Sequence, residues 1–454
     1  MDYDLIAIGG GAAGMAAART AARMHRSVAL VQDGPVGGDC TFTGCVPSKT
    51  LIEAAAAGKQ FPAAMRRVRD TVERIAATET ADVLRGEGID VIEGVASFVD
   101  RRSVRIDGTV LSAPRFVVAT GTRPAVPPID GLQAARHLTN ETVWRLRDTP
   151  RSIIVLGGGP IGCELAQAFA RFGVAVTLVE ATDRLLIREE RDAGEVIAEV
   201  FKGEGIDVRL GAKAVRVEQP AADRVRVVLD DGSALDADHL LVAVGRAPAA
   251  DSLALDAAGI RRDDRGFIRT DDHLSTNVRG VYAAGDITGR LQFTHAADEM
   301  GRIAAVNALR WPLRLRFRTQ TVPWVTFTHP EVARIGLTEA EAAAHRARVA
   351  YLPMNAVDRA ITADATHGFV KLVAGPRRGL GHLGGGRIIG ATIVADRAGE
   401  MIHEVALAAR TGMFTGRLAQ TVHAYPTWSV AIRSAAAQFF FDVDGRRARR
   451  AERH

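Results

Sequence analysis

Short apolar runs, glycine-rich turns and alanine-rich stretches alternate over the first part of the chain. Residues 5–8 predict a buried strand, the alanine-rich stretch to about Met24 predicts a helix, and residues 28–31 predict a second strand. The first strand meets the helix at Gly9-Gly10-Gly11-Ala12-Ala13-Gly14. This order of elements predicts a βαβ unit.

The same pattern recurs from residue 153 onwards. A predicted strand at 153–156 runs into Gly157-Gly158-Gly159-Pro160-Ile161-Gly162, followed by a predicted helix at 163–172 and a strand at 174–179 that ends at Glu180. Two copies at this distance indicate two nucleotide-binding domains rather than a short-period repeat.

The remaining pattern predicts how the domains follow one another. Residues 70–84 look helical, residues 91–106 look like a β-hairpin, and strands are expected at 116–119, 240–244 and 281–284. From about Thr321 the pattern changes to strands at 370–373 and 388–394 with a helix at 399–410, which indicates a separate α+β domain. We therefore predict an α/β protein with two Rossmann-like dinucleotide-binding domains and a C-terminal α+β domain. The expected boundaries are 1–147 and 269–320 for the first domain, 148–268 for the second, and 321–454 for the third.

Composition narrows the classes of protein. Of the 454 residues, 47% are hydrophobic and 24% are charged, which argues against a disordered or fibrous chain. The sequence has no apolar run long enough to span a membrane, and an acidic N-terminus leads directly into the first strand, so we expect no membrane association and no targeting peptide. Three cysteines are too few for a secreted disulfide framework, so a cytoplasmic location is expected.

The formal net charge of +5 invites comparison with nucleic-acid-binding proteins. However, the last ten residues carry five arginines against a single acid, Glu452, so the rest of the chain is close to neutral. We therefore expect no nucleic-acid partner, and we expect the arginine-rich end to be a short mobile appendage without a catalytic role.

Each glycine turn has the spacing that binds a pyrophosphate. The first glycine permits a tight turn, the second lets the phosphates approach the backbone, and the third lets the helix pack closely on the sheet. Glu180 ends the second strand of the second copy, where a carboxylate would accept hydrogen bonds from a ribose 2′-hydroxyl and repel a 2′-phosphate. NADH is thus favoured over NADPH, although Glu180 could also be a solvated strand end. The equivalent residue in the first copy is Gln32, which indicates a different dinucleotide.

Cys40 and Cys45 are the chemically suggestive pair. Four intervening residues allow both a disulfide and a dithiol. Two buried structural thiols or a metal site would fit the same spacing. A metal site is disfavoured, because Cys163 is distant and no histidine spacing completes a ligand set, so no metal ligands are predicted.

The residues around this pair are more specific. The segment Gly37-Gly38-Asp39-Cys40-Thr41-Phe42-Thr43-Gly44-Cys45-Val46-Pro47-Ser48-Lys49, together with both glycine turns, resembles the flavin-dependent pyridine nucleotide–disulfide oxidoreductases, which include dihydrolipoamide dehydrogenase, glutathione reductase and mercuric reductase. The resemblance continues in four further segments, at 119–124, 244–248, 282–286 and 322–328, and ends at 423–427.

The resemblance implies cofactors, partners and roles. Electrons would pass from NAD(P)H through FAD to a Cys40–Cys45 disulfide and on to a disulfide, a metal ion or another acceptor. Cys45 would face the flavin, Cys40 would exchange with the acceptor, and Lys49 would lie by the flavin paired with Glu164. The C-terminal domain would form a homodimer and complete the partner's site. FAD would be bound by Gly9, Gly11, Gly14, Gln32, Gly38, Lys49, Thr120, Gly121 and Asp286, and NAD(P)H by Gly157, Gly159, Gly162, Glu180 and Gly245.

One position departs from the family's pattern. Members that use dithiols have a histidine base followed by Pro-Thr and a later glutamate, where this sequence has Tyr425 and Val430. A phenol with a reference pKa of about 10 is a poor base at neutral pH. Mercuric reductase also has a tyrosine there, but it carries a C-terminal cysteine pair, whereas the last cysteine here is Cys163. We therefore expect a mercuric-reductase-like enzyme with another acceptor.

Three alternatives remain open at this point. The first is a dihydrolipoamide dehydrogenase in which His423 or water replaces the missing base. The second is a flavin-bearing thiol redox sensor without turnover. The third is a plain NADH oxidase or diaphorase in which the thiols are incidental.

Overall fold

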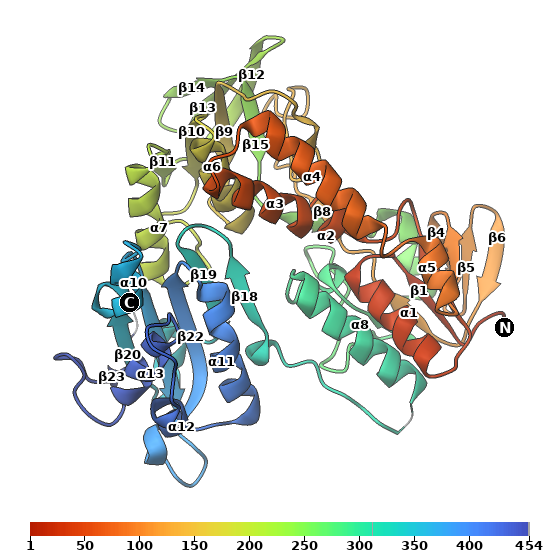
Figure 1. Ribbon diagram of the computed structural model, residues 1–454. Helices are drawn as coiled ribbons and strands as arrows, with labels where there is room; N and C mark the ends of the chain where they lie inside the picture. Colours follow the sequence, from red (N-terminus) through yellow and green to blue (C-terminus); the bar gives the residue numbers. More distant parts are fainter. Residues whose placement is uncertain (311, 453–454) are drawn as a thin grey trace. The chain divides into compact units, whose positions relative to one another are not determined.

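A computed structural model describes residues 1–310 and 312–452 of the chain (Figure 1). The chain divides into two compact units. The first unit comprises Met1–Pro128, His137–Thr149 and Leu241–Arg318, and the second comprises Ile129–Arg136, Pro150–Leu240 and Thr319–His454. Both expected fold classes, the Rossmann-like α/β domains and the C-terminal α+β domain, are confirmed.

The first unit is built around a parallel five-stranded sheet. Its strands are almost entirely apolar because helices and loops bury both faces of the sheet. The order across the sheet is β17 (Val281–Ala283), β7 (Phe116–Val118), β1 (Leu5–Ile8), β2 (Val28–Gln32) and β3 (Asp90–Glu93).

Helix α1 (Ala12–Arg23) follows the first glycine turn and packs along α8 (Thr294–Leu309), as Figure 1 shows. The two backbones touch at Gly301, where a Cβ atom would lie only 2.0 Å from the carbonyl oxygen of Ala13. Glycine is therefore required at this crossing.

The first unit contains four further α-helices and two smaller sheets among its described residues. The helix predicted at 70–84 is divided between α4 and α5, because the Thr80 side chain accepts a hydrogen bond from the Val83 N–H and starts a new helix there. The helices are α2 (Gly38–Phe42), α3 (Cys45–Ala56), α4 (Phe61–Ala76) and α5 (Ala81–Gly86). The smaller sheets contain β4 (Ala96–Asp100), β5 (Ser103–Ile106) and β6 (Thr109–Ser112), and the two-stranded ribbon of β8 (Thr122–Pro124) and β16 (Arg246–Pro248).

The second glycine turn lies in the second unit and precedes helix α6 (Pro160–Arg171). A further helix, α7 (Arg191–Gly203), follows the second strand of this copy. The sheet has the order β11 (Asp207–Leu210), β10 (Ala175–Glu180), β9 (Ser152–Leu156) and β15 (His239–Val242), and a separate antiparallel sheet contains β12 (Ala214–Ala221), β13 (Arg224–Leu229) and β14 (Ala234–Ala237).

The C-terminal part of this unit is an antiparallel sheet with helices packed against it. Its core contains side chains from the sheet and from α11 (Ala398–Thr411), α12 (Thr415–Gln420) and α13 (Val430–Ala437). The strand order is β18 (Pro323–Thr326), β19 (Glu331–Gly336), β22 (Arg387–Ala395), β21 (Phe369–Gly375), β20 (Arg348–Pro353) and β23 (Arg449–Arg450), and the short helices α9 (Glu339–Ala342) and α10 (Asp358–Thr362) join its strands.

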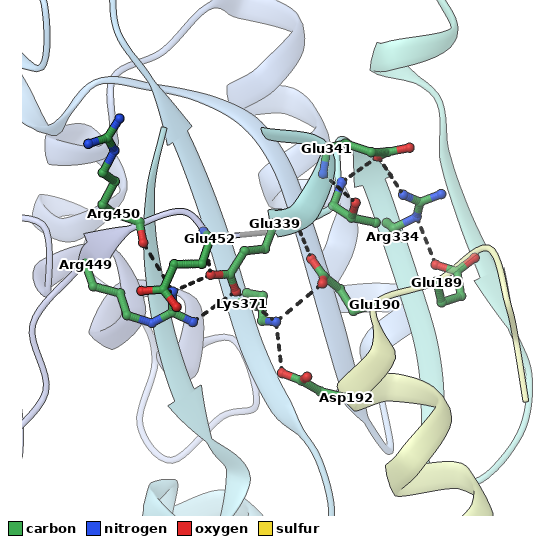
Figure 2. A network of polar contacts seen from close by, with 11 residues as sticks. Glu189, Glu190, Asp192, Arg334, Glu339, Glu341, Lys371, Arg449, Arg450 and Glu452 are labelled. Atoms are coloured by element: carbon green, nitrogen blue, oxygen red, sulfur yellow. Dashed lines mark hydrogen bonds and ion pairs between the residues drawn. The ribbon is translucent and has the colours of Figure 1, made fainter. Parts of the chain in front are cut away.

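A buried ion-pair network joins α7 to this sheet within the second unit (Figure 2). The Lys371 side chain on β21 is 2% exposed, and its Nζ lies 3.4 Å from Glu190, 2.9 Å from Asp192 and 3.2 Å from Glu339. Glu190 also accepts a hydrogen bond from the Glu339 N–H at 2.6 Å. Because the acids outnumber the lysine, a further cation is needed to balance the buried charge.

Arg449 supplies that cation from the end of the chain. Its guanidinium binds both carboxylate oxygens of the buried Glu339, and β23 pairs with β20 so that Arg450 lies opposite Arg348. The prediction of a mobile appendage was therefore wrong for residues 449–452. The composition of the segment shows its charge but does not show the buried acid that binds it.

No helix in residues 1–310 and 312–452 has both the length and the apolar character that crossing a bilayer requires.

Candidate active site

The two glycine turns have the same backbone design. Gly9 and Gly157 both have φ of +108°. A Cβ atom on Gly14 would lie 1.7 Å from the Gly9 carbonyl oxygen, and one on Gly162 would lie 1.8 Å from that of Gly157. These contacts explain why the first and third positions of each turn need glycine.

The middle glycines face open space. A Cβ atom on Gly11 or Gly159 would meet nothing within 4 Å, and these glycines are the N-caps of α1 and α6. The first N–H groups of both helices are thus accessible to a phosphate, which the helix dipole also favours.

The residue that ends the second strand contacts the turn in both copies. Gln32 Oε1 accepts a hydrogen bond from the Gly10 N–H, and Glu180 Oε2 accepts one from the Gly158 N–H at 2.6 Å. Glu180 Oε1 also accepts from the backbone and hydroxyl of Thr182 at 2.7 and 2.9 Å. Both side chains are therefore positioned at the turn, and Glu180 is more than a solvated strand end.

Matched substitutions distinguish the roles of the two turns. We expect Gly14→Ala to yield protein with little bound flavin, since its Cβ would displace the Gly9 carbonyl and widen the first turn. Gly162→Ala should retain flavin but lose at least about tenfold in kcat/KM for the nicotinamide nucleotide, because it alters only the second turn. Flavin absorbance per chain and steady-state kinetics measure the two effects. Full flavin content in Gly14→Ala would contradict the assignment of the first turn.

Residues near the first turn fit a bound dinucleotide. The hydroxyl of Thr120 is buried and has no hydrogen-bond partner, and the next residue, Gly121, has φ of +71°. A cavity of about 420 Å³ opens beside the end of β2, lined in part by Gly34, Pro35 and Glu93. A Cβ atom on Gly9 would lie 3.0 Å from the Thr120 Cα atom, so Thr120 lies against the first turn and its orphaned hydroxyl suits FAD at this site.

The two cysteines lie at a junction of two helices rather than in one helical turn. Cys40 lies in α2 and is partly buried, whereas Cys45 is exposed and begins α3. The chain turns between them at Gly44, where a Cβ atom would approach the Asp39 carbonyl oxygen to 2.9 Å. No disulfide joins the two thiols in this structure.

The environments of the thiols differ. A hydrogen bond to Cys45 raises the pKa of the Cys40 thiol, and burial raises it further. Cys45 lies at the N-terminus of α3, where the helix dipole stabilises a thiolate, and its Sγ is 3.4 Å from the Thr294 hydroxyl oxygen. A proton shared by the pair is therefore better held on Cys40 than on Cys45.

Lys49 and Glu164 belong to different units. Lys49 lies one turn after Cys45 on α3. Glu164 on α6 is buried rather than exposed, and its Oε1 accepts a hydrogen bond from the Phe327 N–H at 2.9 Å. Their pairing stays a prediction, as do the roles of the other site residues.

Polar contacts connect the cysteine loop to Asp286, and sequence reasoning missed most of them. Asp286 is half-buried, and its Oδ2 accepts a hydrogen bond from the Thr122 hydroxyl at 3.1 Å. Arg246 directly follows Gly245, donates to the Thr122 hydroxyl at 2.6 Å and forms a 2.6 Å ion pair with Asp39. Asp39 and Arg246 stand in recognised segments, but no spacing in the sequence indicates that they pair.

Trp144 holds the segment between the cysteines from another side. Its indole N–H donates to the Thr43 carbonyl oxygen at 3.0 Å and to that of Asn140 at 2.6 Å. The Asn140 amide in turn donates to Asp39 at 3.4 Å. The loop is thus fixed by side chains from two distant parts of the sequence.

In the C-terminal segment, Tyr425 and His423 have different partners. The Tyr425 hydroxyl donates to Asp358 Oδ2 at 2.6 Å, and this bond raises the pKa of the phenol. His423 Nε2 lies 3.1 Å from both Glu404 oxygens, and Nδ1 lies 3.0 Å from the Thr421 carbonyl oxygen. Both imidazole nitrogens are engaged within the domain, whereas Tyr425 is 72% exposed.

Comparison with known proteins gives a consistent result. Residues 3–301 match the family model described as pyridine nucleotide-disulphide oxidoreductase, and residues 322–436 match its dimerisation domain. The chain is 34% identical to a mercuric reductase of Bacillus cereus, over 97% of this chain and 72% of that protein. It is 32% identical to a dihydrolipoyl dehydrogenase of Chlamydia pneumoniae, over 94% of this chain and 95% of that protein.

A solved structure agrees with these matches. It is described as the Cu(II) complex of the HOCl-induced flavoprotein disulfide reductase RclA from Escherichia coli. The TM-score is 0.87 at 30% identity, covering 96% of this chain and 99% of that one.

Proposed function

The chain belongs to the pyridine nucleotide-disulphide oxidoreductases, and we propose on this premise that its Cys40–Cys45 pair passes electrons from NADH to a thiophilic metal ion or a disulfide. The family is FAD-dependent and uses NAD(P)H. FAD, when bound, takes a hydride from the nicotinamide and delivers two electrons to the cysteine disulfide. The remaining steps involve only side chains of this protein.

The observation that carries the proposal is the asymmetry of the two thiols. Cys45 lies at a helix N-terminus, which favours a thiolate there that would face the flavin. Cys40 is hydrogen-bonded to Cys45 and would reach the acceptor as a thiol. Reduction of the disulfide to a Cys40 thiol and a Cys45 thiolate consumes two electrons and one proton. Reoxidation by a disulfide acceptor passes these to the acceptor, whose second sulfur takes its proton from solvent.

An anaerobic titration with NADH tests the proposal. We expect long-wavelength charge-transfer absorbance after two electrons per chain, since a Cys45 thiolate would then lie against oxidised flavin. Direct bleaching of the flavin without this band would show that the thiols take no part.

The preference for NADH is the finer part of the cofactor proposal. Glu180 is fixed by Gly158 and Thr182 at the place where the ribose of the nucleotide would lie, so its charge would repel a 2′-phosphate. A kcat/KM for NADH above that for NADPH supports this assignment, and the reverse order contradicts it.

The acceptor is inferred from the C-terminal segment. Both imidazole nitrogens of His423 are engaged, one by Glu404 and one by the Thr421 carbonyl oxygen, which leaves neither available to take a proton from a thiol. Tyr425 instead offers an exposed phenol oxygen fixed by Asp358, which can bind a thiol-bound cation. Mercuric reductases and dihydrolipoyl dehydrogenases match this chain at similar identity, so the preference for a thiophilic metal ion over lipoamide rests on Tyr425 and His423.

Substituting Tyr425 and His423 one at a time distinguishes a metal ion from lipoamide as the acceptor. We expect Tyr425→Phe to lower the kcat for metal-ion reduction by about tenfold, because it removes the phenol oxygen, and His423→Ala to change it by less than about threefold. Stopped-flow reoxidation of the reduced enzyme by Hg²⁺ or Cu²⁺ and by lipoamide measures both. The opposite pattern, with lipoamide turnover abolished only in His423→Ala, would establish a dihydrolipoamide dehydrogenase.

The match of residues 322–436 to the dimerisation domain indicates a homodimer. We infer that Tyr425 of one subunit serves the cysteines of the other. Co-purified heterodimers that carry Cys40→Ser on one subunit and Tyr425→Phe on the other test this: one of their two sites should keep full metal-ion reduction. Loss of both sites would contradict the inference.

A further inference from the structure

We propose that Arg246 is a positioning residue for the thiol chemistry, which it serves by holding Asp39, the residue directly before Cys40. The inference rests on the proposed function, since it assigns a role within that same site. All the residues involved belong to the first unit.

Arg246 joins two structural elements through one guanidinium group. It lies on β16, and its side chain is 11% exposed. Nη2 forms a 2.6 Å ion pair with Asp39 Oδ2 on α2 and donates to the Thr122 carbonyl oxygen at 3.0 Å, while Nε donates to the Thr122 hydroxyl at 2.6 Å. A planar guanidinium can make these contacts at once, which a lysine could not do with the same geometry.

Asp39 transmits this restraint to the thiol. Its Oδ1 accepts hydrogen bonds from the Thr43 hydroxyl and, at 3.4 Å, from the Asn140 amide. Asp39 and Cys40 are consecutive residues of the five-residue helix α2, so the contacts that fix the Asp39 side chain also restrain the backbone that carries the Cys40 sulfur. The side chain of Asp39 is 36% exposed, and its fixed position therefore depends on these partners.

Arg246 is also connected to Asp286, because both side chains hydrogen-bond to the Thr122 hydroxyl. Burial raises the pKa of the Asp286 carboxyl, and the charge of Arg246 opposes that rise. The same charge opposes the rise in the pKa of Glu141, which comes from burial and from Asp39. Arg246 thus compensates three acids around the redox loop, and Asp286 is the one predicted to contact the flavin.

Geometry of this kind has a large effect on rate. A misplacement of about 1 Å between reacting groups can reduce a rate by about 100-fold. Arg246 touches neither sulfur and acts on Cys40 only through Asp39. Its loss should therefore slow the steps that need Cys40 and spare those that need only the flavin.

The test uses Arg246→Gln, Asp39→Ala and the double variant in the full-length, flavin-loaded protein. The matched control is Arg123→Gln, because Arg123 lies on the paired strand β8 and forms an exposed ion pair with Asp251. For Arg246→Gln and Asp39→Ala we expect the reduction of Hg²⁺ or of a small disulfide to fall about 10- to 100-fold. The charge-transfer band should weaken, because a displaced Cys40 thiol would compete poorly for the hydrogen bond that it makes with the Cys45 thiolate. Direct reduction of a dye by the flavin should stay within about twofold of the unmodified protein.

The double variant decides whether the two residues act together. If they act as one pair, it should be no slower than the more affected single variant, whereas independent effects would multiply. Multiplying effects, an unchanged band, or an equal loss in the dye assay would each overturn the proposal. If Arg246→Gln does not fold, the same three measurements are made on Asp39→Ala alone. If the unmodified protein reduces no acceptor, the proposed function is rejected. The strength of the charge-transfer band in Arg246→Gln would still test the positioning role of Arg246.

Discussion

Replacing either Cys40 or Cys45 by serine is expected to lower thiol-dependent reduction of a metal ion or disulfide by about 1,000-fold or more. A hydroxyl neither forms the disulfide that accepts electrons nor acts as a nucleophile at neutral pH, so no other group in the loop can replace the missing sulfur. Reduction of a dye directly by the flavin should remain within about twofold.

The two variants should differ in their spectra. In Cys40→Ser the remaining Cys45 would lie at the N-terminus of α3 and be available as a thiolate, so long-wavelength absorbance is expected without added reductant. In Cys45→Ser the remaining Cys40 is partly buried and lacks that helix terminus, so the band should be absent.

Cys163 provides the control. It lies fully buried in α6, where burial raises its pKa, and its Sγ lies 3.3 Å from the Gly158 carbonyl oxygen. Cys163→Ala should retain thiol-dependent turnover. Retention of acceptor reduction in Cys40→Ser and Cys45→Ser would instead identify a diaphorase whose thiols are incidental.

Replacing Lys371 by methionine is expected to destabilise the second unit by about 3–5 kcal/mol. Methionine fills a similar volume but leaves Glu190 and Glu339 buried without their shared cation, and Arg449 binds only one of them (Figure 2). The midpoint of urea or thermal unfolding measures the loss, with Lys59→Met as the control because Lys59 is exposed.

The loss should depend on pH in a defined direction. Without the lysine, desolvation and mutual repulsion would raise the pKa values of the acids above their unfolded values. The unfolded chain would then bind fewer protons than the folded one, so the stability of the variant should fall as pH rises through those raised values. We expect a larger deficit at about pH 8 than at about pH 5.5. Equal stability of Lys371→Met and Lys59→Met at both values would contradict a structural role for the network.

The sequence predicted those helices, strands and turns whose formation depends on neighbouring residues. The two glycine turns, their flanking strands and the C-terminal change of pattern were visible because each depends on neighbouring residues. The helix at 70–84 was predicted as continuous because a threonine can stand inside a helix or cap one, and only the contact of Thr80 with Val83 decides between these states.

The parts that could not be predicted depend on partners far away in the sequence. Lys371 stands in a predicted strand, and no spacing shows that Glu190 and Asp192 surround it. Asp39 and Arg246 are likewise paired only by the fold. Charged residues in such positions look like surface residues until the opposite charge is located.

The pairing of Arg449 with Glu339 also has a practical consequence for handling the protein. Only five residues would separate a purification tag fused after residue 454 from an arginine that closes a buried charge cluster, whereas Met1 is 70% exposed and precedes the first strand. Affinity tags and immobilisation linkers therefore belong at the N-terminus. Libraries that trim the arginine-rich end to improve solubility would select against correctly assembled protein.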